Sequence, residues 1–192
     1  MLRRLFSCPG GILLAAALTS AAFAGTAAAG PAGQSSISIL REGEAFKVDA
    51  VLVAPVTPRE AWEVLTDFDR MSAFVPSITE SRVLRRAGNQ LTVLQKGVVR
   101  LGFLGFDFES LREVELEPED TVRSHNIGGN VRRLESLTRF HAAAGGALIS
   151  YRVEIIPDFW IPGFIAEYLI RREIQDQFEA IVKEMLRRRQ AR

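Results

Sequence analysis

The sequence predicts an α+β fold: a curved, seven-stranded antiparallel sheet with two short helices and one long C-terminal helix over an apolar cavity. Three observations predict it. Strand-like segments separated by Gly, Pro and Asn fill the middle of the chain, which is typical of consecutive antiparallel hairpins. Two short helical patterns precede most of these segments, and a long helical pattern follows them. A single helix cannot fill the concave side of so wide a sheet, so bulky side chains, a lid or a guest must occupy the remaining space.

Residues 1–24 have the pattern of a secretory signal peptide. Arg3 and Arg4 form a short positive head, and the apolar run that follows, Ile12–Leu18, is too short to span a bilayer. The tripeptide Ala22–Ala24 places small residues at the positions that a signal peptidase reads. Because the head is of a bacterial type, we expect export to the periplasm.

Cleavage after Ala24, with Ala29 as the alternative, would leave a flexible leader, residues 25–40, and one domain, residues 41–192. The leader is rich in Ala, Gly and Ser. Cys8, the one cysteine of the sequence, would be removed with the signal, which excludes a disulfide, a thiol nucleophile and a thiolate metal site. Removal of Arg3 and Arg4 with the signal would change the formal net charge from +1 to −1, and this near-zero charge argues against nucleic acid as a partner.

The first elements of the domain carry clear local signals. Apolar and polar residues alternate over Glu44–Ala54, which predicts a half-buried strand. Thr57 and Glu60 have the spacing of a capping box around Pro58, so we expect a helix with Trp62 on its inner side. A second short helix is expected over residues 69–74, ended by a proline.

The rest of the chain predicts six more strands and the long helix. The helix is expected over residues 162–189, with apolar residues on one broad stripe. The stripe consists of Phe164, Tyr168, Ile174, Phe178, Val182, Met185 and Leu186. The six strands are expected at Ile78–Arg86, Gln90–Leu101, Phe106–Leu116, Thr121–Ile127, Arg132–His141 and Ala147–Ile156.

Two segments resemble a known superfamily. VLVAPVTPREAWEVLTDFDRMSAFVPSITESRVL, Val51–Leu84, resembles the opening strand, paired helices and second strand of the START-like helix-grip (SRPBCC) superfamily. YRVEIIPDFWIPGFIAEYLI, Tyr151–Ile170, resembles its last strand, gate loop and grip helix. The resemblance spans Arg41–Arg189 and is nearest to the coenzyme Q-binding START and polyketide cyclase branches. It implies a START-like domain in an exported bacterial member. Members bind lipids, quinones, polyketides or plant hormones, and a minority catalyse.

Polar residues on the predicted inner face of the long helix are the first candidates for binding a ligand. Arg171 and Gln175 fall in the middle of the apolar stripe, where a guanidinium could hold a carboxylate, a phosphate or a quinone oxygen. The alternative is that Glu167, one turn earlier, pairs with Arg171 at a polar rim. Tyr151 alternates with apolar residues and is expected to face inward.

Aromatic residues supply the other candidates. Phe159 and Trp160 lie between prolines, outside regular structure, so they either close the mouth of the cavity or touch a membrane. We favour the gate. Phe106 and Phe108 make the central sheet apolar, and ordinary core packing is their alternative role. The full set of candidate ligand-binding residues is Trp62, Phe106, Phe108, Tyr151, Phe159, Trp160, Phe164, Tyr168, Arg171, Gln175 and Phe178.

Other polar residues give little support for catalysis. His125 and His141 have no acidic partner at a telling spacing, so no metal site or catalytic triad is predicted, and no cofactor is expected. Asp67 and Asp69 fit turn and cap chemistry. We therefore expect a periplasmic binding or carrier protein for a hydrophobic small molecule, with transient membrane contact as a further role. The alternatives are a cyclase or dehydratase acting on a polyketide-like substrate, and an interaction protein with a filled core.

Overall fold

The computed structural model describes residues 35–101, 104–158 and 162–192. They form an eight-stranded antiparallel sheet in the order β1-β2-β8-β7-β6-β5-β4-β3. The strands are β1 Ser35–Glu42, β2 Ala45–Ala54, β3 Ile78–Ala87, β4 Gln90–Leu101, β5 Leu104–Glu117, β6 Thr121–Gly129, β7 Val131–Ala143 and β8 Gly146–Pro157. The helices are α1 Pro58–Leu65, the short 3-10 helix η1 Phe68–Ala73, and α2 Gly163–Gln190.

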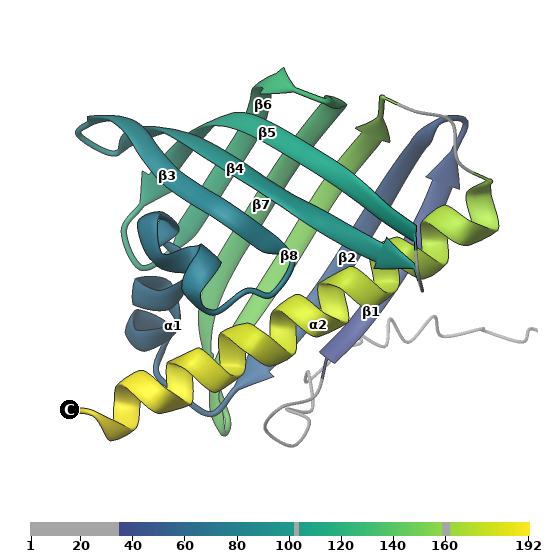
Figure 1. The fold of residues 1–192 in the computed structure, drawn as a ribbon. Coiled ribbons are helices and arrows are strands. Elements are labelled where there is room, and N and C mark those ends of the chain that lie inside the picture. The colour runs from purple at the N-terminus through teal and green to yellow at the C-terminus, as the bar shows by residue number, and fades with distance from the viewer. Residues whose placement is uncertain (1–34, 102–103, 159–161) are drawn as a thin grey trace, which may run out of the picture.

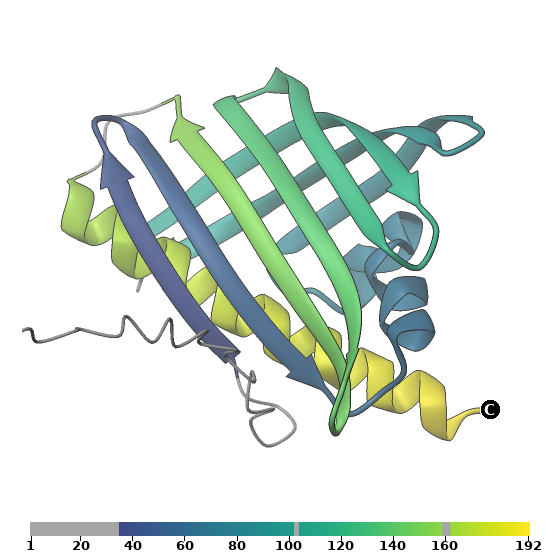
Figure 2. The same cartoon turned by 180° about the vertical axis from the view of Figure 1, so that it is seen from behind.

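The sheet curls strongly around the long helix. In Figure 1, α2 crosses the concave side of the sheet diagonally, and α1 lies near its C-terminal end. Seen from behind, β3, β4 and β5 pass behind β2, β8 and β7, so the two halves of the sheet face each other across the interior (Figure 2). Within the described residues, no helix has the length and apolar character needed to cross a membrane.

The predicted count of seven strands is wrong, because β1 is an eighth strand. It pairs with β2 in the register Ile37↔Ala50 and Ile39↔Val48, and both isoleucines pack against the core. β1 takes residues 35–40 from the segment predicted as a flexible leader. The alternation of Ser and Ile before Leu40 was the available signal, but it directly follows a stretch of small residues that does not favour a strand.

The other elements lie close to the predicted ranges. The capping box is confirmed: the Glu60 backbone N–H donates to Thr57 Oγ1 over 3.2 Å, and the Thr57 N–H donates to Glu60 Oε2 over 2.8 Å. The α2 helix begins one residue later than predicted and ends one residue later. The fold is therefore an α+β arrangement with the predicted order of elements after the first strand.

The C-terminal end of α2 is fastened to the α1–η1 region by charged groups. Glu184, which is 7% exposed, accepts hydrogen bonds from Arg187 Nε and Arg188 Nε, each over 2.7 Å. Arg188 also donates to Asp67 Oδ2 over 2.7 Å and lies over the Phe74 ring. The basic residues at this helix end are thus paired. Asp67, which the sequence suggested for cap chemistry, accepts from this helix.

Glu184 should make stability depend on pH. Its hydrogen bonds from Arg187 and Arg188 lower the pKa of the buried carboxyl from 4.5 to about 2. Since the folded pKa is below that of the unfolded chain, the stabilisation is present above pH 4.5 and is lost as the pH falls toward 2. We expect Glu184→Gln to lower the free energy of unfolding at neutral pH by about 2–3 kcal/mol.

Urea unfolding of both proteins between neutral pH and strongly acidic pH would measure this effect. The difference between wild type and variant should shrink as the pH falls. Glu179→Gln, on an exposed position of the same helix, is the matched control and should leave stability nearly unchanged. A difference that stays constant at all pH values would show that the Glu184 charge is not responsible.

Candidate functional site

A cavity of 350 Å³ lies between the concave side of the sheet and α2. This volume is at the lower end of the range for small-molecule pockets. Most of the wall is apolar, and it is built from both halves of the sheet together with η1 and α2. Representative apolar wall residues are Leu52, Phe68, Val75, Phe106, Phe108, Leu134, Ile149, Val153, Ile170 and Phe178.

A polar group interrupts this apolar wall on β4 and β5. The Gln95 side chain is buried, and its amide nitrogen donates to Ser81 Oγ over 3.1 Å and contacts Met71 Sδ at 3.1 Å. Its carbonyl oxygen accepts a hydrogen bond from an Arg112 terminal nitrogen. The bonds from the Gln95 amide therefore fix the side chain so that its oxygen faces the arginine.

Arg112 is a cation in the cavity wall. It is positioned by β5, where inward residues alternate as Ser110, Arg112 and Val114, and a bulge in β6 interrupts the register beside it. Burial lowers the pKa of Arg112 because the guanidinium loses water. Burial also raises the pKa of the Tyr151 hydroxyl, although the nearby Arg112 charge opposes that rise. Both residues retain their usual forms at neutral pH: Arg112 charged, Tyr151 neutral.

Several predicted site residues do line the cavity. Phe106, Phe108, Tyr151 and Phe178 contribute to its wall from β5, β8 and α2. Trp62 does not, because its ring packs edge-on against Phe140 at 5.3 Å between ring centroids, and Phe140 is the residue that reaches the cavity. Phe159 and Trp160 lie outside the described residues.

Four predicted residues of α2 need correction. Phe164 and Tyr168 are 77% and 52% exposed, and Arg171 and Gln175 are also exposed. None of the four lines the cavity. Arg171 donates to the Ile37 carbonyl oxygen of β1 over 2.6 Å.

The predicted stripe is right at Ile174, Phe178 and Met185, which are buried, but wrong at its start, where Phe164 and Tyr168 are exposed. The smaller residues Ala166 and Leu169 mark the buried face, which continues through Glu173, Ile174 and Gln177. Glu173 and Gln177 are two positions beyond the predicted anchors, and two residues turn a helix by about 200°. Glu173 accepts hydrogen bonds from Ser77 Oγ and from Gln177 Nε2, which ties α2 to the segment before β3.

The sequence reasoning missed Gln95, Ser110 and Arg112. The available signal was the period of two along β5, since Phe106, Phe108, Ser110, Arg112 and Val114 share one face of the strand. A charged residue at an inward position of that alternation marks a buried charge, whereas charged residues on strands usually face solvent. Arg112 was not considered as a site residue because a charged residue on a strand is expected to face solvent.

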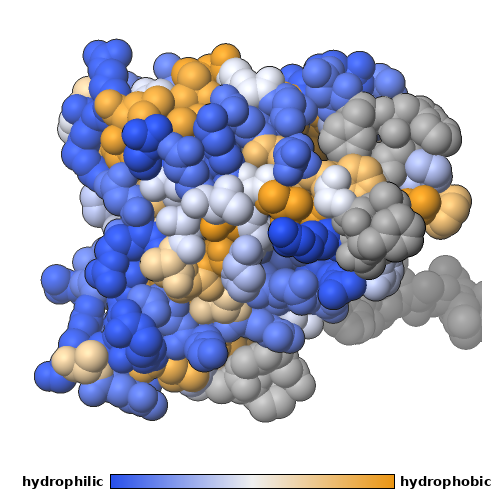
Figure 3. Space-filling view, viewed as in Figure 1, coloured by the Kyte–Doolittle hydropathy of each residue, from blue (hydrophilic) through white to orange (hydrophobic). Residues whose placement is uncertain are grey.

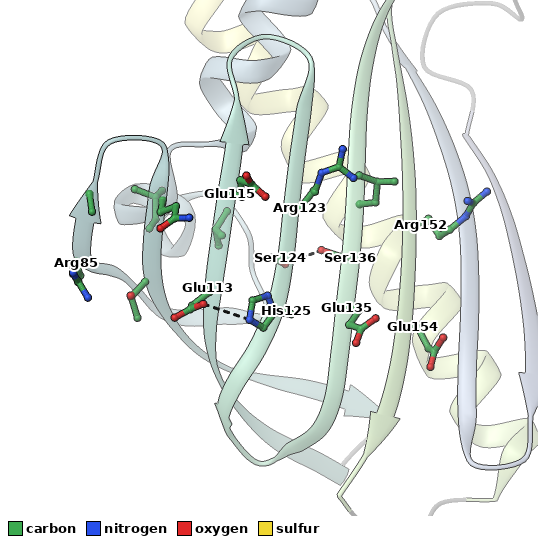
Figure 4. A pocket seen from close by; sticks show the side chains of 16 residues that line it. Arg85, Glu113, Glu115, Arg123, Ser124, His125, Glu135, Ser136, Arg152 and Glu154 are labelled. Carbon is green, nitrogen blue, oxygen red and sulfur yellow. Dashed lines mark hydrogen bonds and ion pairs between the residues drawn. The ribbon is translucent and has the colours of Figure 1, made fainter.

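The outer face of the sheet carries a second hollow, of 620 Å³, and most of its side chains are polar or charged (Figure 4). His125 lies 3.4 Å from Glu113, an acidic partner that the sequence spacing had not indicated. Both side chains are exposed, as are Arg152 and Glu135 nearby. Although this hollow is larger, most of its charged side chains are exposed and do not enclose a ligand, so the inner cavity is the candidate site.

Two further observations limit the chemistry. In the described part of the chain, no group of three or more His, Cys, Asp or Glu side chains is arranged to hold a metal ion. On the face that carries α2, hydrophilic residues predominate, and apolar residues are exposed in separate groups (Figure 3). The site is thus an internal apolar cavity with a few polar side chains.

The chain belongs to the family described as polyketide cyclase/dehydrase and lipid transport, whose sequence pattern matches residues 54–182. This match confirms the resemblance to the START-like superfamily. A search of curated proteins gave no match.

Solved structures share the fold at low sequence identity. A START superfamily protein from Mycobacterium smegmatis has a TM-score of 0.64 and 12% identity, covering 73% of this chain and 97% of its own. The Zhui aromatase/cyclase from Streptomyces sp. R1128 has a TM-score of 0.61 and 13% identity, with 75% and 95% covered. A STAR-related lipid transfer protein from Xanthomonas axonopodis has a TM-score of 0.62 and 12% identity, with 78% and 98% covered.

The shape of the cavity depends on one close approach at Gly97. A Cβ at this position would lie 2.0 Å from the Ser77 carbonyl oxygen and 2.5 Å from the Phe108 ring. The absence of a side chain therefore lets the Phe108 ring pack across β4. We expect Gly97→Ala to lower the free energy of unfolding by about 1–3 kcal/mol, because the backbone or the ring must move. Denaturant unfolding would measure it.

Gly128→Ala is the matched control, since a Cβ there would make ordinary contact with Leu111 at 3.6 Å. It should cost less than Gly97→Ala. Equal losses for the two variants would show that the contact between Gly97 and Phe108 is not a constraint on the wall.

Proposed function

We propose that the protein binds and carries a hydrophobic small molecule in the cavity between the sheet and α2. The observation that supports this role most directly is the 350 Å³ space with a mainly apolar wall. Membership of a family that includes lipid transport supports it further. Lipid-, quinone- and polyketide-like compounds are the ligand classes that we propose.

A carrier fits the described wall better than a cyclase or dehydratase. An enzyme of that type needs a proton-transfer group aimed at the substrate. Among the described wall residues the carboxylates are Asp107, which is exposed, and Glu173, which accepts hydrogen bonds from Ser77 and Gln177; no histidine lines this part of the wall. Transient contact with a membrane is part of the proposed role, supported by exposed Phe164 and Tyr168 at the beginning of α2.

Filling the cavity tests the proposed role. Ala166 is buried on the cavity side of α2, so Ala166→Phe should occupy the space and abolish binding of apolar ligands. Native mass spectrometry of the wild-type protein should show a co-purifying apolar compound, and the variant should lack it. Gln175→Phe, on the exposed side of the same helix, is the control and should retain the compound.

Circular dichroism and thermal unfolding would confirm that both variants are folded. A wild-type protein that carries no compound, and that shows no thermal shift with a panel of lipids and quinones, would contradict the carrier role.

We also propose that the protein acts in the periplasm. The support is the sequence of residues 1–24, which lie outside the described residues. Protein expressed with its natural N-terminus in a Gram-negative host should be found in the periplasmic fraction and should begin at residue 25 or 30. Replacing Arg3 and Arg4 with Glu should reduce export. Uncleaved wild-type protein in the cytoplasm would contradict this location.

A further inference from the structure

Arg112 is a half-buried cation in the cavity wall, and it has no acidic partner among the described residues. Its terminal nitrogen donates to the neutral Gln95 side chain, while its Nε is buried and has no hydrogen-bonding partner among the described residues. No carboxylate in the described part of the chain contributes to the shift of its pKa, which burial lowers. A buried charge is normally paired, because an uncompensated one is strongly unfavourable.

A second unsatisfied atom lies on the same strand face. The Ser110 hydroxyl is buried and also has no partner among the described residues. Ser110 and Arg112 are two residues apart on β5, so their side chains point to the same side of the sheet, and both line the cavity. Buried polar atoms without partners are rare in folded proteins, and two of them in residues that line a cavity indicate a ligand group at that part of the wall.

The neighbouring side chains fix the orientation of the Arg112 guanidinium. The Gln95 amide is fixed by Ser81 and Met71, so its oxygen holds one terminal nitrogen of the guanidinium and leaves the Nε–H without an acceptor. A carboxylate or phosphate is the acceptor that fits a guanidinium best, because it takes two parallel hydrogen bonds and supplies the missing charge.

We propose that the ligand is an amphipathic acid whose anionic head group binds Arg112 and Ser110 while its apolar body fills the rest of the cavity. This proposal rests on the carrier role proposed above. The head group adds what the described protein residues lack, a negative charge beside Arg112. The apolar body would extend along β5 past Phe108 to Phe106, which is six residues from Arg112, or roughly 20 Å of strand.

Three probes with the same apolar chain test the proposal: dodecanoate, dodecyl phosphate and dodecanol. Isothermal titration calorimetry on delipidated, folded protein should show that at least one anion binds about tenfold more tightly than the alcohol, or better. The preferred anion distinguishes a carboxylic acid from a phosphate ester as the natural head group. Arg112→Met should remove the preference by weakening anion binding while retaining the alcohol.

Arg139→Met, which makes the same charge change at an exposed position on β7, is the matched control and should bind as the wild type does. If Arg112→Met does not fold, the proposal can still be tested on the wild-type protein. Dodecanoate isotope-labelled at its carboxyl carbon should show by NMR a bound carboxyl pKa below that of the free acid, because the adjacent guanidinium stabilises the anion.

The outcomes separate the two proposals. Equal binding of acid and alcohol, with an unshifted carboxyl pKa, would overturn the assignment of an acidic ligand and leave the carrier role intact. This is the result expected if ordered water, and not a ligand, satisfies Arg112. Failure of the wild-type protein to bind any of the three probes or any lipid or quinone would overturn both. Anion-selective binding that persists in Arg112→Met would place the head group elsewhere and overturn the role of Arg112.

Discussion

The curvature of the sheet is the constraint on which the rest of the structure depends. Adjacent strands are about 4.8 Å apart and a helix with its side chains is about 10–12 Å across, so one helix cannot cover eight strands. The twist of the strands bends the sheet until its two halves face each other, and α2 closes the concave side along one diagonal (Figures 1 and 2). The remaining 350 Å³ is a consequence of this geometry.

Elements with strong local chemistry could be predicted from the sequence, and those set by tertiary contacts could not. The Thr57–Glu60 box and the alternating strands are local patterns, and they were found within a few residues. β1 was missed because a short strand at the sheet edge depends on its pairing with β2. The inner face of α2 was misjudged in its first turns, where Phe164 and Tyr168 suggested it by their size, whereas packing against the sheet selected Ala166 and Leu169.

The candidate site shows the same division. Tyr151 was placed inward by alternation, and Phe106 and Phe108 were expected to make the central sheet apolar; the structure brings all three to the cavity wall. Arg112 follows the same alternation, yet its charge favours a position that faces solvent. Only the structure shows that Gln95 on the neighbouring strand contacts it from the cavity side. Buried charges are therefore difficult to predict from one sequence, because the compensating groups come from distant segments or from a bound molecule.

The hydrogen bond from Arg171 to the Ile37 carbonyl has a consequence beyond the attachment of α2. β1 is an edge strand, and an unpaired strand edge can add the strand of another molecule. The first turns of α2 thus shield a site of intermolecular β-pairing as well as the interior. If the protein carries a ligand as proposed, a movement of α2 that releases it would also uncover that edge and would favour self-association.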